Sequence, residues 1–491
     1  MALLEEACEW AASLRVADIP DDVRTLAVAT LISDLAAAWA GLEHPAGPAV
    51  MRRWRAGTGA GRAARAAALT MLLDWDETCF AGHVGHSTAL PALLLGAERG
   101  CDGAEVTRAL VAGIELAARV TGALTLGRAR GQTAAHTHLA GAAVVGGVLA
   151  GLPAGQLAGA TALSLSHPRE VLLPAFMGSD AKFAVAAAPL QDALTAVDAA
   201  PRATATLDIL ERDGGLFERL CDVPLPEAMG GYGSRWHTRT MSFKRDPGCA
   251  YISAAVEGAG GLGPVELEEV ERVEIGCSIF TLGMEAESAP FIAGPATPLP
   301  ALNFSVGYSV AAALEDGSLE AGDFHPETVA SEARWRVAGA VTLRHDPGLT
   351  LAALAATAPM GMALAWAGER ARAYLERRGA PGELAGRVLA AAAENLADPE
   401  FRDPGKRIGA DIVVHLRDGR RLESGRGAAT GSCQESALER LRLVEQKLRR
   451  VASAPESHNE LARRLPELTA AEVRDLAAPL IARLEEAPSA A

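Results

Sequence analysis

The residues of this chain that could carry out acid–base chemistry are concentrated in one region of the sequence. Five of the eleven histidines lie there, at His83, His86, His136, His138 and His167. Three acidic residues, Asp74, Asp76 and Glu77, come shortly before the first pair. Ionisable groups at this density in apolar sequence are costly to bury unless they are paired or used. We therefore expect a site that moves protons or binds an anion.

The first histidine pair is predicted to lie in a glycine-rich loop. Ser87 or Thr88 is expected to cap the following helix, whose N-terminus would point free N–H groups into that loop. Such a helix start beside glycine and histidine favours a bound anion. The structural alternative is that Asp74 and Asp76 are solvated and that the histidines only fill gaps.

The second pair, His136 and His138, opens an apolar helix. A cationic ring is disfavoured in the first turn of a helix, so either histidine would be neutral and suited to act as a base. The two pairs could instead hold a metal ion together with Asp74 or Asp76. Because neither spacing is a specific metal signature, we expect no metal.

Lys182 and Lys244 stand out because lysine is scarce in this sequence. Lys182 begins an alanine-rich helix, and Lys244 precedes a Pro-Gly turn. Since apolar sequence flanks both, each is a candidate for binding a substrate carboxylate; the alternative is an exposed lysine beside a turn. We expect both lysines to converge with the histidines on one pocket at the domain boundary, although 161 positions separate His83 from Lys244.

Composition limits the class of protein. The chain has 491 residues, a formal net charge of −15, 49% hydrophobic and 22% charged residues. The apolar content supports a sizeable core, and the acidic balance argues against a nucleic-acid partner or an anionic membrane surface. Seven scattered cysteines without C-x-x-C fit a reducing compartment. Because the N-terminus is acidic and the longest apolar run, residues 139–152, is too short to span a membrane, we expect a cytoplasmic protein.

The hydrophobic pattern predicts a mainly α protein with a smaller α/β domain. Residues 1–261 form the all-helical domain, residues 262–430 the α/β domain, and residues 431–491 C-terminal helices that pack back on the helical domain. Helices are expected at 23–41, 62–73, 88–98, 104–122, 136–150, 154–165, 183–199, 305–315 and 382–396. Strands are expected at 270–277, at 335–343 and in a hairpin at 411–422 around an Asp-Gly turn.

Read together, these motifs resemble those of the MmgE/PrpD family, which includes 2-methylcitrate dehydratase, cis-aconitate decarboxylase and iminodisuccinate epimerase. Residues 74–78, Asp-Trp-Asp-Glu-Thr, are similar to the family's D-[FY]-D-D-T, and a histidine loop and Leu-Pro-Ala-Leu follow. The His136 region is similar to its H-x-T…G…AA helix, and Lys182 and Ser-Phe-Lys244 to its two lysine motifs. Residues 304–317 and 407–419 resemble two later motifs, so the matches run in order from about 25 to 425.

The resemblance implies a large all-helical domain, a smaller lid-like α+β domain, a homodimer, and no organic cofactor or metal. It implies active-site roles for Asp74, Thr78, His83 or His86, His136 or His138, Lys182, Lys244 and Tyr308. Family members with dehydratase or decarboxylase activity often carry a histidine shortly after the second lysine, where this chain has Gly-Cys-Ala-Tyr251. Tyr251 could donate a proton in its place.

These observations predict a cofactor-free lyase acting on a small-molecule carboxylate. Our first expectation is a dehydratase of a hydroxy di- or tricarboxylate, in which a neutral histidine takes the α-proton and lysines neutralise the carboxylates. A decarboxylase or an epimerase with the same site is the alternative within the resemblance. Two alternatives from other classes are a metal-dependent hydrolase that uses both histidine pairs and a catalytically idle dimeric scaffold.

Overall fold

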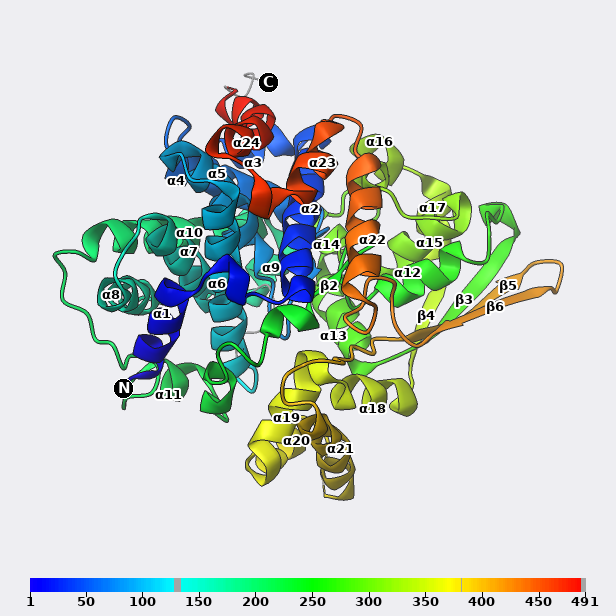
Figure 1. Ribbon diagram of the computed structural model, residues 1–491. Coiled ribbons are helices and arrows are strands. Elements are labelled where there is room, and N and C mark those ends of the chain that lie inside the picture. The colour runs from blue at the N-terminus through cyan, green and yellow to red at the C-terminus, as the bar shows by residue number, and fades with distance from the viewer. Residues whose placement is uncertain (128–133, 381, 487–491) are drawn as a thin grey trace.

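The computed structural model describes residues 1–127, 134–380 and 382–486. Over these ranges the chain is mainly helical, with a four-stranded sheet and a two-stranded ladder (Figure 1). The predicted class, mainly α with a smaller α/β part, is therefore confirmed. Residues 131–133, which lead into the second histidine pair, and 487–491 of the predicted C-terminal part lie outside the described ranges.

The first half of the chain is a layered helical assembly. Alanine-rich sequence favours helices, and small side chains let neighbouring helices approach closely. For example, a Cβ placed on Gly113 would lie 3.3 Å from the backbone oxygen of Gly141, where two of these helices cross. The helices are α1 (Leu3–Ser13), α2 (Asp21–Glu43), α3 (Gly47–Met51), α4 (Gly59–Thr70), α5 (Gly85–Arg99), α6 (Gly103–Ala123), α7 (Ala135–Leu149), α8 (Ala154–Leu165), α9 (Leu173–Gly178), α10 (Ala184–Ala199) and α11 (Leu216–Leu220).

Helix α2 is the central helix of this assembly. It is long and apolar enough to cross a membrane by length and composition, but 94% of its apolar window is buried inside the protein. A core helix of a globular domain has the same properties.

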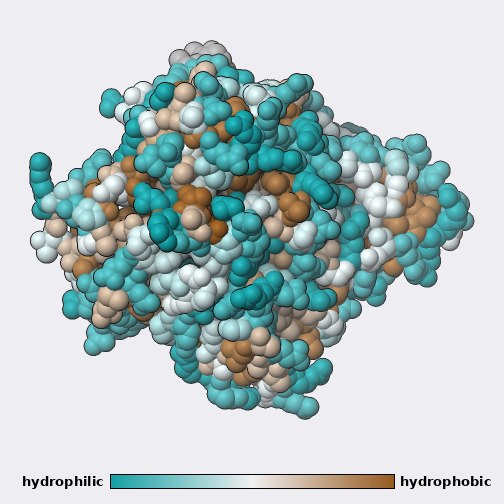
Figure 2. All heavy atoms as spheres, viewed as in Figure 1, coloured by the Kyte–Doolittle hydropathy of each residue, from teal (hydrophilic) through white to brown (hydrophobic). Residues whose placement is uncertain are grey.

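The face of the molecule seen in Figure 2 is mostly hydrophilic, with apolar side chains gathered in small patches.

The sheet lies at the opposite side of the molecule from α8 (Figure 1). Its strand order is β4-β3-β5-β6; β3 and β4 are parallel and the other pairs are antiparallel. The predicted strand at 270–277 and the predicted hairpin are both confirmed. The elements of this part are α12 (Ser253–Gly260), β3 (Val270–Cys277), α13 (Ile279–Ser288), α14 (Leu299–Leu302), α15 (Val306–Asp316), α16 (Pro326–Val329), α17 (Glu332–Ala338), β4 (Val341–His345), β5 (Ala410–Leu416) and β6 (Arg421–Arg426).

The predicted strand at 335–343 is wrong in its first half. Residues up to Ala338 belong to helix α17, and the strand β4 begins only at Val341. Ser331 caps this helix by accepting from the backbone N–H of Arg334, and the ring of Trp335 packs on that of Tyr308, 5.0 Å away. The cap and this packing against α15 outweigh the β-branched composition.

The α/β part also contains a helical unit that the sequence pattern does not separate. Helices α18 (Pro347–Ala355), α19 (Met362–Ala367), α20 (Arg372–Arg377) and α21 (Glu383–Ala393) project below the rest of the molecule in Figure 1. They enclose a second core around Tyr374, which also includes Phe80, Leu126 and Leu225 from the helical domain. The segment 262–430 is therefore a sheet unit with a helical insertion.

The C-terminal helices return to the helical domain. Helix α22 (Ala437–Arg449) packs along α2, and α24 (Ala470–Glu485) packs on α4 and α5. Helix α23 (Ser457–Arg463) connects them and also contacts α2. This return places Lys447 beside the acidic segment at residues 74–78.

Candidate active site

The acidic segment is positioned by a short strand ladder. After α4 ends at Thr70, the chain turns, and Asp74 adopts a left-handed conformation with φ of 52°. The two-residue strand β1 (Glu77–Thr78) then pairs antiparallel with β2 (Ser242–Phe243). Because Lys244 directly follows β2, this ladder brings it to the aspartates, 168 positions away in the case of Asp76.

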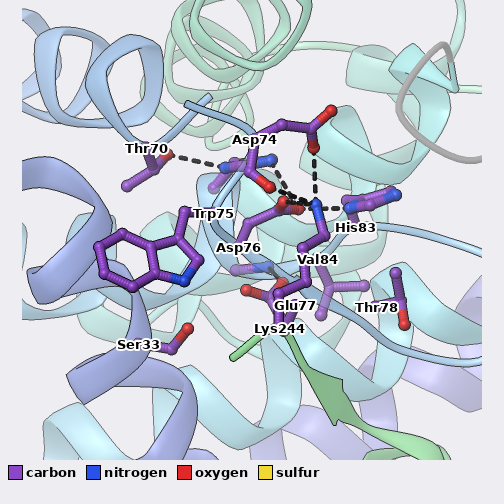
Figure 3. Close-up of polar contacts among 12 residues, drawn as sticks. Ser33, Thr70, Asp74, Trp75, Asp76, Glu77, Thr78, His83, Val84 and Lys244 are labelled. Atoms are coloured by element: carbon purple, nitrogen blue, oxygen red, sulfur yellow. Dashed lines mark hydrogen bonds and ion pairs between the residues drawn. The ribbon is translucent and has the colours of Figure 1, made fainter. Parts of the chain in front are cut away.

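Two lysines meet two aspartates in a buried cluster, and Figure 3 shows Lys244 beside Asp74 and Asp76. Lys244 Nζ lies 2.6 Å from Asp74 Oδ1 and 2.5 Å from Asp76 Oδ1. Lys182 Nζ lies 3.1 Å from Asp74 Oδ2. All four side chains are at most 4% exposed. The lysines predicted to bind a substrate carboxylate are thus bound to the protein's own carboxylates, and the four charges balance.

Proximity of opposite charges sets the ionisation of this cluster. Burial alone would raise the pKa of Asp76, but the adjacent His83 and the Lys244 ammonium outweigh it and hold that pKa well below its usual value. Burial likewise opposes ionisation of Asp74, yet Lys182 and Lys244 lower its pKa overall. Both aspartates are therefore carboxylates at neutral pH. For Lys244, the two aspartates outweigh burial and raise its pKa.

The first histidine pair is attached to Asp76. Asp76 Oδ2 accepts a hydrogen bond from His83 Nδ1, and His86 Nε2 lies 3.1 Å from the same oxygen. The other nitrogen of His86 lies 2.7 Å from Thr70 Oγ1. His83 is 9% exposed, whereas His86 is fully buried. A carboxylate at Nδ1 fixes the ring and the tautomer of His83, as a supporting carboxylate does in catalytic dyads.

The second pair extends this group of histidines. The ring of His138 lies 6.0 Å from that of His86, and its Nδ1 lies 3.1 Å from Ser87 Oγ. Burial lowers the pKa of His136 to about 4, and burial with the neighbouring histidines lowers the pKa of His138 well below its usual value. Both rings are therefore neutral at pH 7, the state that the sequence predicts. His167, in contrast, is exposed.

The predicted anion site at the start of α5 is filled by the protein itself. Helix α5 begins at Gly85, before the predicted caps Ser87 and Thr88, whose hydroxyls bond the backbone oxygen of Val84. The N–H of Gly85 donates to Glu77 Oε1 at 2.6 Å. The buried Glu77 carboxylate satisfies this helix N-terminus as an external anion would.

A second buried polar group lies behind the segment. A Cβ on Gly85 would lie 2.6 Å from Glu77 Oε2 and 2.7 Å from Asp34 Oδ2, so the two carboxyl groups meet at the start of α5. Burial and the charge of Glu77 raise the pKa of Asp34 well above its usual value. Lys447 donates to Ser33 Oγ at 2.9 Å and to the backbone oxygen of Trp75.

Three of these residues could hold a metal ion. Asp76, His83 and His86 each offer one ligand atom, and these atoms lie within 4.8 Å of one another. However, the Lys244 ammonium lies 2.5 Å from Asp76 and already supplies a positive charge there. His136 and His138 do not belong to this group among the described residues, so the alternative in which both pairs surround one ion is not formed.

A small pocket lies beside the cluster, between the helical domain and the segments that flank the β5–β6 hairpin. Its volume is about 20 Å³, roughly the space of one water molecule. Thr78 lies in its wall, and Lys406 Nζ donates to Thr78 Oγ1 at 2.5 Å. The lining residues are Thr78, Ser242, Phe243, Lys244, Ala250, Ser253, Lys406, Ile408, Ala429, Thr430 and Ser432.

The two predicted tyrosines lie differently. Tyr251 follows Ala250 of the pocket wall, and its ring stacks on Phe280, 5.5 Å away. Tyr308 is not brought to the cluster: it is fully buried in the α/β part, and its hydroxyl donates to the backbone oxygen of Asp323 at 2.5 Å. Burial raises the pKa of Tyr308 to about 12. Its motif therefore serves packing in this structure.

Sequence reasoning missed two lysines, although a signal was available. The chain has only four lysines, and all four contact the segment 74–78: Lys182 at Asp74, Lys244 at Asp74 and Asp76, Lys447 at Trp75 and Lys406 at Thr78. Each is at most 7% exposed. Lysine is ordinarily a surface residue. Because arginine supplies the exposed positive charges of this chain, its rare lysines are candidates for buried or functional positions.

No family model and no curated protein matches this sequence.

Proposed function

We propose that the protein is a cofactor-free lyase that dehydrates a hydroxy di- or tricarboxylate. Its active site is the cluster of Asp74, Asp76, Lys182, Lys244 and the attached histidines, together with the adjacent pocket. The proposal includes an MmgE/PrpD-like fold, a homodimer and a cytoplasmic location, which rest on the motif resemblance and on composition.

The observation that carries the proposal is the hydrogen bond between His83 and Asp76 inside a buried, charge-balanced cluster. Buried ion pairs seldom add stability over apolar side chains of similar size. Ionised groups held together with histidines are, however, the usual means of moving protons in an active site. Of the four predicted histidines, His83 is the most accessible, at 9% exposed.

The proposed reaction follows from these positions. Nε2 of His83, with Nδ1 held by Asp76, takes a proton from the carbon next to a substrate carboxylate. The electrons of that C–H bond form the C=C bond while the C–O bond to the hydroxyl group breaks. Tyr251 supplies the proton with which the hydroxyl leaves as water. Lys244, which stays paired with the aspartates but lines the pocket, stabilises the negative charge that develops on the substrate carboxylate.

The same site could support two related reactions. Loss of CO2 instead of water gives a decarboxylase, and return of the proton to the opposite face gives an epimerase. Both need the same base and the same neutralisation of carboxylates. They are the alternatives within the proposal.

A direct screen tests the proposal. Chelator-treated protein is incubated with 2-methylcitrate, citrate, malate, cis-aconitate and iminodisuccinate, and the products are followed by proton NMR. We expect one hydroxy acid to lose water, and His83→Gln to abolish this turnover. His167→Gln is the matched control, because His167 is exposed. No change in any compound, or equal turnover by the His83 variant, would refute the proposal.

A metal-dependent hydrolase is the second candidate. The observation in its favour is the group of Asp76, His83 and His86, a carboxylate and two histidines within 4.8 Å. Such a set is a known ligand arrangement for divalent metals. It predicts ester or amide hydrolysis that disappears with chelator and returns with zinc, which a parallel assay on ester and amide substrates would reveal.

A further inference from the structure

Lys406 is a buried cation, and among the described residues no aspartate or glutamate forms an ion pair with it. Its side chain is only 7% exposed. Its ammonium donates a hydrogen bond to the hydroxyl of Thr78. By contrast, Lys182 and Lys244 each have an aspartate within 3.1 Å. A buried ammonium with no counter-charge is costly, so its presence calls for a ligand.

The groups around Lys406 do not supply that counter-charge. Lys244 is a second cation, and its two neighbouring carboxylates, Asp74 and Asp76, are already bound to it. The thiols of Cys249 and Cys433 also face Lys406, but burial raises the pKa of both. They are therefore neutral at pH 7.

A carboxylate further back is also in use. Glu257 lies behind the pocket wall, where it accepts from Thr430 and pairs with Arg426. Burial lowers the pKa of Lys406 to about 8, so that most of it is protonated at pH 7. The pocket thus presents a positive charge that the described residues leave uncompensated.

The hydroxyls of the pocket are arranged to donate. Thr78 Oγ1 accepts its hydrogen bond from Lys406, and Ser242 Oγ accepts one from the backbone N–H of Cys433. The Thr78 oxygen, which accepts, retains its own O–H proton for another partner, and the Ser242 hydroxyl, which also contacts the Cys433 side chain, can turn its proton toward the pocket. Two hydroxyl donors beside an ammonium are a suitable set for the two oxygens of a carboxylate.

We propose that Lys406, with the hydroxyls of Thr78 and Ser242, forms the subsite that binds a carboxylate group of the substrate. This inference rests on the proposed function for the identity of the substrate class. It reassigns the carboxylate anchor from Lys182 and Lys244, which hold Asp74 and Asp76, to Lys406. The volume of about 20 Å³ means that the walls must separate to admit a whole di- or tricarboxylate.

Succinate binding tests the subsite, because succinate has two carboxylates and no hydroxyl group to lose. Calorimetric titration of the full chain at pH 7 is expected to show saturable binding. Lys406→Met should weaken this binding at least 10-fold and Lys406→Arg should retain most of it. The matched control is Arg407→Met, which removes an exposed positive charge from the neighbouring position. Equal succinate affinity in the wild type and Lys406→Met overturns the subsite, as does no binding to the wild type.

A pH series on the wild type tests the same subsite without a variant. Succinate stays fully ionised above pH 7, whereas Lys406 loses its proton above about 8. The affinity of the wild-type protein for succinate should therefore fall by roughly 10–30-fold between pH 7 and pH 9.5. An affinity that does not change over this range overturns the proposal.

Failure of the subsite can be told apart from failure of the proposed function. Succinate binding that depends on Lys406, without turnover of any hydroxy acid, supports the subsite and refutes the lyase. Turnover of a hydroxy acid with the same KM in the wild type and in Lys406→Met refutes the subsite and leaves the lyase standing.

Discussion

The ammonium of Lys244 lies 2.5 Å from Asp76 Oδ1, although the two residues are 168 positions apart in the sequence. The β1–β2 ladder creates this contact, because Thr78 pairs with Ser242. Asp76 lies two residues before Thr78, and Lys244 lies two residues after Ser242. Asp76 in turn accepts a hydrogen bond from His83 through its other oxygen. One carboxylate thus links a structural cation to the histidine that we propose as the base.

The two lysines nearest the pocket should respond oppositely to removal of their charge. Lys244→Met leaves Asp76 without its lysine partner and Asp74 with Lys182 alone, so it should lower the free energy of unfolding by roughly 3–5 kcal/mol. Lys406→Met removes an uncompensated charge and should not destabilise the fold at pH 7. Urea unfolding at pH 7 measures both. Similar losses in the two variants would show that Lys406 has a counter-charge within the protein.

Substitution of His83, the proposed base, should reduce turnover more than substitution of His136. His83→Gln should lower turnover roughly 10²–10⁴-fold with little change in substrate affinity, because a base acts on the transition state. His136→Gln should have a smaller effect, since His136 is only 2% exposed. Steady-state kinetics on the substrate found by screening give both numbers. A larger loss for His136 than for His83 would move the base to the second histidine pair.

The pKa of His136 predicts how stability changes with pH. Its folded value of about 4 lies below the usual 6.5. As the pH falls from 6.5 to 4, the unfolded chain binds a proton that the folded chain does not, so stability is lost across this range. Between these pH values the free energy of unfolding of the His136→Gln variant should therefore fall by about 3 kcal/mol less than that of the wild type. Urea curves for the two proteins that shift in parallel from pH 7 to pH 4 would contradict this assignment.

Metal dependence separates the two candidate functions. The wild type should retain activity after chelator treatment and should give no cobalt absorption at stoichiometric Co²⁺, because Lys244 occupies Asp76. Lys244→Gln removes the positive charge beside that carboxylate and should increase cobalt affinity. Tight cobalt binding by the wild type through His83 and His86, with activity that needs the metal, would favour the hydrolase.

The fold was predictable where local pattern determines it. The hairpin was found because an Asp-Gly turn separates two alternating runs, and the helical domain because alanine-rich apolar blocks recur. Helix α17 was missed because it is stabilised by the packing of Trp335 against Tyr308, which lies on another helix. Such long-range packing leaves no period in the sequence.

The candidate site was predictable in part for a related reason. Residue types identified Asp74, His83, His86, His138, Lys182 and Lys244, which do come together. Their pairing was not predictable, because the carboxylates that neutralise the lysines could equally have been solvated. Tyr308 was misplaced, since its motif is explained by a hydrogen bond to Asp323. Lys406 was overlooked because it precedes a strand and has no motif of its own.

Proton abstraction from carbon is the central claim, and solvent deuterium measures it most directly. The substrate found by screening is incubated in D2O with chelator-treated wild type and with His83→Gln, and recovered substrate and product are analysed by NMR. The account predicts loss of the α-proton with the wild type, at a rate at least roughly 100-fold above that of the variant. Product formed with the α-proton retained, or equal exchange by the two proteins, would contradict it.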